Sequence, residues 1–270
     1  MSKKIVVIAV ILIGVLYWFY TKQDSVSKND VGEQIKTNQV DEKIKKQATQ
    51  NEPVAPSKKE SLVVKGIDVS HFQGDINWEE IKSAGINFSY SKATQGHGFK
   101  DPKFQMNWKN AQAAGLAAGA YHFYMVGSKA EPQVKIFLEA VGKLNPGDMP
   151  PMIDLEQGSI PKGVKVDVVT FQKNVITWLN EVERELGVQP IIYTNNPFAN
   201  AYLKDSTFSK YKLWLAEYGV DTPRVPATWS NKGWTIWQRS ERGKIEGAIG
   251  NIDHDLLNTK LFSLEELQVD

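Results

Sequence analysis

The sequence predicts an α/β fold between residues 61 and 270, in the form of an irregular (β/α)8 barrel of the TIM type. Short apolar runs alternate there with longer amphipathic stretches, and the connections are short, which favours parallel strands joined by right-handed crossovers. Eight strand-like runs follow one another over about 200 residues, the number that closes such a barrel. The same alternation allows a doubly wound parallel sheet, which is the alternative.

The expected elements follow from apolar spacing. Strands are expected at residues 63–70, 86–92, 117–124, 149–156, 190–195, 212–218, 233–239 and 250–256. Helices are expected at residues 78–84, 101–114, 129–144 and 167–186, the last with apolar residues at spacings of three and four. Gly85, Gly115 and Gly187 stand just past helix ends, where a left-handed residue is favoured. Later helices are short or missing, so the barrel is expected to be irregular.

Charge and composition exclude several classes of function. The 270 residues include 32 Lys and Arg against 31 Asp and Glu, and the resulting net charge of +1 disfavours a nucleic-acid partner. No cysteine is present, which excludes disulfides, thiolate metal sites and a cysteine nucleophile. The sequence has no G-x-S-x-G elbow, phosphate loop or dinucleotide fingerprint. No cofactor is therefore expected.

The N-terminus has the composition of a membrane segment. Residues 5–20 are uncharged and almost wholly apolar, follow two lysines, and end in an aromatic cluster suited to the membrane–water interface. We interpret residues 1–22 as an uncleaved signal-anchor, which predicts a single-pass protein of the cell membrane with its catalytic domain outside. The alternative is a cleaved signal peptide, with a weak site at Ser25-Val26-Ser27, and it predicts a secreted protein.

A polar segment separates this apolar run from the barrel. Residues 21–60 contain eight lysines, seven acids and no aromatic residue. Such a composition cannot bury enough apolar surface to offset the entropy lost on ordering. Residues 23–60 are therefore predicted to be a disordered linker.

The strongest chemical signal is a pair of carboxylates at the end of the fourth strand. Asp154 and Glu156 are two residues apart, so on a strand they project to the same face. Neighbouring carboxylates resist simultaneous ionisation, and one pKa is expected to rise. Such a pair can combine a protonated acid with an ionised partner.

In a barrel of this type the catalytic groups lie at the rim formed by the carboxyl ends of the strands. Other acids are expected at this rim. Asp68 ends the first strand and Glu217 lies near the end of the sixth. In the last strand Asp253 and Asp255 share one face, and His254 points to the other. Because this set alternates between faces and no helical H-x-x-x-H pair is present, no metal site is expected.

Aromatic residues are expected at the same rim. Tyr124, Tyr193 and Tyr218 fall at strand ends and, with Trp214 and Gln238, are the expected substrate-binding residues. A pyranose ring has apolar faces and polar edges, so it suits aromatic rings with carboxylate neighbours. Carboxylates and aromatic platforms without a cofactor indicate glycoside chemistry.

Short motifs over residues 64–258 strengthen this interpretation. They are GIDVS (66–70), SKATQG (91–96), GAYHF (119–123), IDLE (153–156), IYT (192–194), LWLA (213–216), WQ (237–238) and GNID (250–253). In this order they resemble the motifs of glycoside hydrolase family 25, the lysozymes (N-acetylmuramidases) of bacteria, phages and fungi. The resemblance implies an irregular barrel and hydrolysis of the β-1,4 bond between N-acetylmuramic acid and N-acetylglucosamine in peptidoglycan.

The resemblance also implies roles for individual residues. Glu156 matches the general acid, Asp154 its neighbouring carboxylate, and Asp68 and Asp253 two further rim aspartates. The sequence departs from the family at Gln95, where an acid is common, and we expect this to affect substrate contacts more than chemistry. The alternative function is a catalytically weak wall-binding module tethered to the membrane.

The strand positions of the two carboxylates also predict stereochemistry. Glu156 is expected to protonate the leaving oxygen. Because Asp154 approaches the sugar from the same strand, net retention of configuration is expected. The nucleophile is either Asp154 or the N-acetyl oxygen of the substrate.

Overall fold

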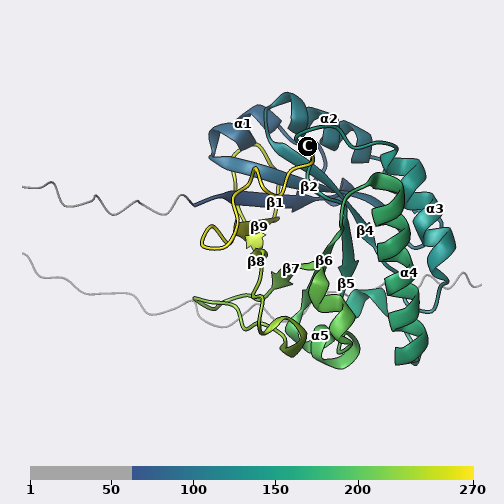
Figure 1. Cartoon of the computed structure of the whole chain (residues 1–270). Coiled ribbons are helices and arrows are strands. Elements are labelled where there is room, and N and C mark those ends of the chain that lie inside the picture. Colours follow the sequence, from purple (N-terminus) through teal and green to yellow (C-terminus); the bar gives the residue numbers. More distant parts are fainter. Residues whose placement is uncertain (1–62) are drawn as a thin grey trace, which may run out of the picture. The chain divides into compact units, whose positions relative to one another are not determined.

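The computed structural model describes residues 63–270, so the predicted signal-anchor (1–22) and linker (23–60) lie outside the described residues. In the described part, eight strands close into a barrel (Figure 1). The sheet closes because β1 pairs with both β2 and β9, which excludes the doubly wound alternative. The strands are β1 (Lys65–Val69), β2 (Ile86–Gln95), β4 (Ala117–Phe123), β5 (Met152–Leu155), β6 (Ile191–Asn195), β7 (Lys212–Ala216), β8 (Ile236–Gly243) and β9 (Ile252–Leu257).

Strand β9 departs from the parallel pattern. The pairings from β1–β2 round to β7–β8 are parallel, whereas β9 is antiparallel to both β8 and β1. Asp253 of β9 lies directly opposite Asp68 of β1. The expectation that rim acids follow the carboxyl ends of strands is therefore wrong for Asp253, which reaches the rim from the amino end of β9.

Five helices of the described part cover the outside of the barrel (Figure 1). They are α1 (Trp78–Ser83), α2 (Phe104–Ala113), α3 (Ala130–Val141), α4 (Val168–Leu186) and α5 (Asn196–Tyr202). The first four lie within their predicted ranges. Gly85, Gly115 and Gly187 follow α1, α2 and α4 with φ of 84°, 78° and 73°, the left-handed conformation that favours glycine.

One α-helix and one strand were not predicted. Helix α5 begins after Asn195, whose side chain accepts a hydrogen bond from the Phe198 N–H, and Pro197 stands in its first turn. Strand β3 (Phe99–Lys100) pairs with the end of β2 as a short hairpin. After β7 the described chain contains a 3-10 turn (Ala227–Trp229) but no further α-helix, so the barrel is irregular.

Two apolar layers stabilise the barrel. The inner layer fills its centre and includes Phe88, Tyr90 and Trp214, while the outer layer joins the sheet to the helices and includes Trp178 and Leu179 of α4. Burying one large apolar side chain stabilises a fold by roughly 1.5–3 kcal/mol. Across residues 63–270, the helices are too short or too polar to cross a membrane.

Candidate active site

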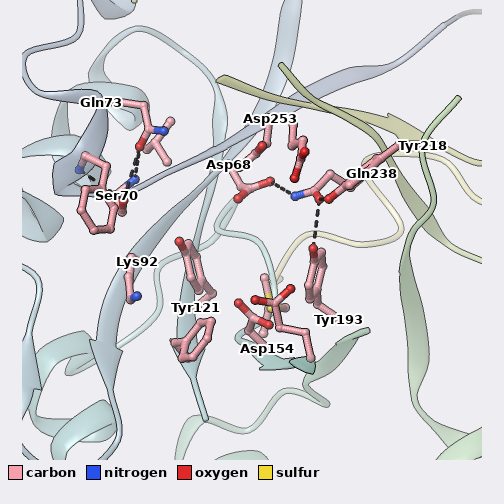
Figure 2. A pocket seen from close by; sticks show the side chains of 16 residues that line it. Asp68, Ser70, Gln73, Lys92, Tyr121, Asp154, Tyr193, Tyr218, Gln238 and Asp253 are labelled. Carbon is pink, nitrogen blue, oxygen red and sulfur yellow. Dashed lines mark hydrogen bonds between the residues drawn. The ribbon is translucent and has the colours of Figure 1, made fainter. Parts of the chain in front are cut away.

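A cavity of about 270 Å³ opens at the rim of the barrel, where the predicted acids meet (Figure 2). Most of its walls come from strand ends, and the turns that follow them supply the rest. It is lined by Asp68, Val69, Ser70, Phe72, Gln73, Lys92, Tyr121, Phe123, Met152, Asp154, Glu156, Tyr193, Tyr218, Gln238, Glu241 and Asp253.

Strand β5 places Asp154 and Glu156 on the cavity. Asp154 lies beside Tyr193 of β6 in the barrel register, and its Oδ1 atom is buried without a hydrogen-bond partner among the described residues. Glu156 follows β5 directly, and its backbone N–H donates to Ser159 Oγ at 3.2 Å. Gly158 leaves room for the Glu156 carboxyl, because a Cβ at Gly158 would lie 3.0 Å from Oε1.

Burial raises the pKa of both carboxyls. For Asp154 burial is the largest cause, and the negative charges of Glu156 and Asp68 add to it. Burial also raises the pKa of Glu156, against the opposing charge of Lys92. The sequence predicted one raised pKa, whereas both are raised. The pair therefore holds a proton at a pH where isolated carboxyls are ionised.

Lys92 of β2 brings positive charge to these acids. Its Nζ donates to Gln95 Oε1 at 2.7 Å and lies 4.6 Å from the centre of the Phe123 ring. Burial lowers the pKa of Lys92, and its charge lowers the pKa of Asp154 and of Glu156. The sequence departs from the family pattern at Gln95. Because Gln95 is uncharged, it does not neutralise the ammonium group of Lys92, whose positive charge acts on Asp154 and Glu156.

A hydrogen-bond network fixes the opposite wall. Gln238 donates from Nε2 to Asp68 Oδ2 at 2.7 Å. Its Oε1 accepts from the hydroxyls of Tyr193, at 2.9 Å, and Tyr218, at 2.5 Å (Figure 2). The amide therefore has one orientation, since its oxygen must face the tyrosines and its nitrogen the carboxylate. Tyr193 and Tyr218, both predicted from strand ends, meet at this single amide oxygen.

Three aspartates share this wall. Burial is the largest cause of the raised pKa of Asp68, Asp253 and Asp255, and it raises the pKa of Asp253 to about 9. The negative charge of a neighbouring aspartate further raises the pKa of each. Asp255 lies deeper and accepts from Trp214 Nε1 at 3.2 Å. The wall therefore presents proton donors to a ligand at neutral pH.

The sequence model of the glycosyl hydrolases family 25 matches residues 67–248, which include the rim acids of β1 and β5. This chain belongs to glycosyl hydrolase family 25. It is 35% identical over 205 residues to Lysozyme M1 of Streptomyces globisporus, a match that covers 72% of this chain and 68% of that protein.

Two solved structures share the fold of this family 25 hydrolase. The bacterial lysozyme of Streptomyces coelicolor has a TM-score of 0.69 at 32% identity, over 75% of this chain and 97% of that one. A family GH25 lysozyme of Aspergillus fumigatus has a TM-score of 0.66 at 31% identity, over 74% of this chain and 99% of that one. The glycoside hydrolase class implied by the motifs is therefore confirmed.

Two predicted substrate contacts of the family 25 hydrolase lie outside the cavity. Tyr124 is buried, with its ring 6.2 Å from that of Phe171 in α4. Since Phe123 lines the cavity, Tyr124 lies on the opposite face, toward the helices. Trp214 is buried beneath the cavity, 4.8 Å from the Tyr90 ring. Both predictions of direct contact are wrong, and Trp214 contributes by supporting the aspartate wall from below.

Other lining residues were not predicted as site residues, among them Gln73, Lys92, Tyr121 and Glu241. Lys92 could have been predicted from the sequence, because it is the polar last residue of the strand expected at residues 86–92, and polar residues at strand ends are candidates for the site. Glu217, predicted as a rim acid, does not line the cavity and instead pairs with Arg224, with 2.6 Å between Oε1 and Nη2. A position at a strand end is therefore not enough to place a carboxylate in the cavity when a neighbouring cation pairs with it.

Proposed function

We propose that this family 25 hydrolase is a muramidase that cleaves the β-1,4 bond between N-acetylmuramic acid and N-acetylglucosamine in peptidoglycan, with Glu156 as general acid and net retention. The observation that carries the proposal is the pair Asp154 and Glu156, two carboxyls of raised pKa at the end of one strand, on a cavity walled by tyrosines. The lysozymes to which the chain is similar support the substrate class.

Glu156 is assigned the catalytic proton because of its position. Asp154 is only 8% exposed, whereas Glu156 is partly exposed at the mouth of β5. Burial alone favours Asp154 as the proton carrier of the free enzyme. A bound sugar excludes water from Glu156, raises its pKa and favours transfer of the proton to it. Asp154 is then ionised, with the charge of Lys92 stabilising that form.

The proposed reaction takes place as two successive displacements at the anomeric carbon, which together give net retention. Glu156 protonates the leaving oxygen, and positive charge develops at the anomeric carbon opposite the ionised Asp154. Either Asp154 or the N-acetyl oxygen attacks that carbon from the face opposite the leaving oxygen as the glycosidic C–O bond breaks. Water then attacks the same carbon from the other face, Glu156 accepts its proton, and the bond to Asp154 or to the N-acetyl oxygen breaks. In the second route Asp154 or the protonated Asp253 orients the acetamido group. A substrate with a free amine in place of that group is cleaved by the first route and not by the second.

Analysis of reducing ends tests the proposed bond specificity. Purified peptidoglycan is digested with the full-length protein, reduced with borohydride and examined by mass spectrometry, with Glu156→Gln as the matched control. We expect products that end in reduced muramic acid with the wild type and at least about 100-fold slower formation of these products with the variant. Reduced glucosamine ends would indicate a glucosaminidase, and wall binding without products would favour the wall-binding module.

For the N-terminal region we propose a membrane anchor at residues 5–20 and a tether at residues 23–60. The apolar run, its preceding lysines and its terminal aromatic cluster support this proposal. The full-length protein is expected to sediment with membranes, resist extraction by high salt, and release its domain when protease is added from outside. A mature N-terminus at residue 28 would show cleavage and identify a secreted enzyme.

A further inference from the structure

A strip of three aromatic rings continues from the cavity across the outer rim. Phe72 lines the cavity and is 80% exposed. The His71 ring lies against it, with 4.1 Å between ring centres and 34° between planes. The Phe99 ring lies 5.5 Å from the His71 ring and is also exposed. Phe72, His71 and Phe99 form what we call the aromatic strip, which leads outward from the acids.

Hydrogen bonds hold the strip in place. The buried Asp101 accepts from the His71 backbone N–H at 3.0 Å, and its Oδ2 atom lies 2.7 Å from His71 Nδ1. Ser70 Oγ accepts from the Phe72 N–H at 3.3 Å, and the Ser70 N–H donates to Gln73 Oε1 at 2.9 Å. The turn that carries Phe72 is therefore preorganised, which lowers the entropic cost of binding a ligand there.

The exposure of the strip calls for a functional explanation. One face of the Phe72 ring rests on His71, which leaves the other largely in water. Leaving apolar surface in water is unfavourable in proportion to its area. Single exposed apolar residues are common, but adjoining rings at the edge of a polar cavity are typical of a binding surface.

The surroundings favour a neutral ligand with an apolar face. Lys100 of β3 is paired with Glu139 at 3.0 Å, and Lys103 is paired with Asp75. Because these charges are already compensated, an acidic peptide is disfavoured as the occupant. A pyranose ring, with C–H groups on its face and hydroxyls at its edge, matches aromatic rings without needing a charge.

The strip extends the cavity in one direction. Ser70 and Gln73, which flank Phe72 in the sequence, lie across the cavity from Tyr193 and Tyr218, with Asp68 between the two sides (Figure 2). A chain of sugars that passes the acids and leaves the cavity on this side meets Phe72 first and Phe99 farther out. The occupant is therefore the continuation of the same glycan strand.

We propose that the aromatic strip is an additional sugar-binding subsite, in which an N-acetylated hexosamine ring of the strand stacks on Phe72. This inference rests on the proposed function, since it takes the same glycan as its ligand. The subsite begins at Phe72 on the edge of the cavity and extends outward along the strip. It therefore increases affinity for long strands much more than for a ligand short enough to fill the cavity alone.

Titration calorimetry with peptide-free glycans of two lengths tests the subsite. All proteins carry Glu156→Gln to prevent cleavage, and the ligands are a disaccharide and strands of at least six sugars. Phe72→Ala is expected to weaken binding of the long strands by about five- to tenfold and binding of the disaccharide by less than about twofold. Phe72→Trp should retain the affinity for long strands. Leu261→Ala, which shortens an apolar side chain that is 55% exposed and does not line the cavity, should change neither affinity.

The outcomes separate the subsite from the proposed function. Equal weakening for both lengths, no weakening for either, or no binding of long strands by the parent would overturn the subsite. Unchanged thermal unfolding of Phe72→Ala excludes loss of the fold as a cause. Bond specificity is measured separately with the wild type, so long-strand binding through Phe72 without muramic-acid products would retain the subsite and overturn the muramidase.

Discussion

The two groups of acids that meet at the cavity are held in different ways. On β5, the Oδ1 atom of Asp154 has no hydrogen-bond partner among the described residues, and the nearby charge that opposes its raised pKa is that of Lys92. On the opposite wall, Asp68 of β1 accepts from Gln238 and Asp255 of β9 accepts from Trp214. One group is free to exchange a proton, and the other is fixed in a network.

This difference corresponds to two tasks in hydrolysis. A carboxyl that gains and loses a proton in every turnover must not depend on one protonation state for its position. A carboxyl that only binds substrate benefits from a network that fixes its position. This difference supports the proposal that Asp154 and Glu156 carry out the chemistry and that Asp68, Asp253 and their partners position the substrate.

The largest effect is expected from Glu156→Gln. The amide has nearly the same shape but cannot donate the catalytic proton, so kcat should fall by about 10²–10⁴-fold while thermal unfolding stays close to wild type. Steady-state hydrolysis of soluble muropeptide strands measures this loss. Retention of more than about a tenth of kcat by the folded variant would remove Glu156 from the role of acid.

A smaller loss is expected from Gly158→Ala, which displaces the acid without removing it. The added Cβ would lie 3.0 Å from Glu156 Oε1 and 3.1 Å from Phe123 Cζ, so the carboxyl must move. Because misplacement by about 1 Å can cost up to 10²-fold, we expect kcat to fall by about tenfold. Gly98→Ala is the matched control, since a Cβ there meets nothing within 4 Å. Equal kcat values for the two variants would contradict the account.

On the networked wall, Gln238→Leu should affect binding and stability more than chemistry. It leaves Asp68 and the hydroxyls of Tyr193 and Tyr218 without their shared partner. The free energy of unfolding should fall by about 1–3 kcal/mol, and KM should rise more than kcat falls. Denaturant unfolding and steady-state kinetics measure the two effects. Tyr218→Phe, which removes one of the three bonds, should cause a smaller loss, and a reversed order of the two variants would contradict the network.

The smallest expected effect is on the pH dependence of stability. Burial raises the pKa of Asp253 to about 9, whereas an unfolded aspartate titrates near 3.9. Between these values the folded state binds more protons, so the contribution of Asp253 to stability is present at low pH and is lost as the pH rises toward 9. Asp253→Asn cannot ionise, so its melting temperature should fall less between pH 5 and pH 8.5 than that of the wild type. Equal slopes in thermal unfolding would show that Asp253 titrates normally.

Much of the fold could be predicted because local patterns determine it. The apolar spacing of α4 and the glycines after α1 and α2 are visible in the sequence, and they place elements correctly. The direction of β9 could not be predicted in this way, because an alternating run reads the same in a parallel and an antiparallel strand. Its direction depends on pairing with β1 and β8, which brings together residues far apart in the chain.

The site was predictable to the extent that strand alternation fixes side-chain direction. Asp154 and Glu156 are two residues apart and line one cavity, as the period of a strand requires. Tyr124 was misplaced because a shift of one residue reverses the face. Trp214 was misplaced because strand alternation shows that a side chain points into the barrel but not how far below the rim it lies. Contacts such as that between Lys92 and Gln95 require the folded geometry of the strand end.

In the proposed mechanism Asp154 and Glu156 act from one strand, and product stereochemistry tests this directly. Proton NMR of the first product from a soluble muropeptide strand, recorded before mutarotation, measures the configuration at the new reducing end. A β-anomer is expected, because two carboxyls that leave one strand two residues apart lie close together, whereas inversion requires about 6.5–9.5 Å between them to leave room for the attacking water. Initial formation of the α-anomer would contradict the account and assign the catalytic base to Asp68 or Asp253 on the opposite wall.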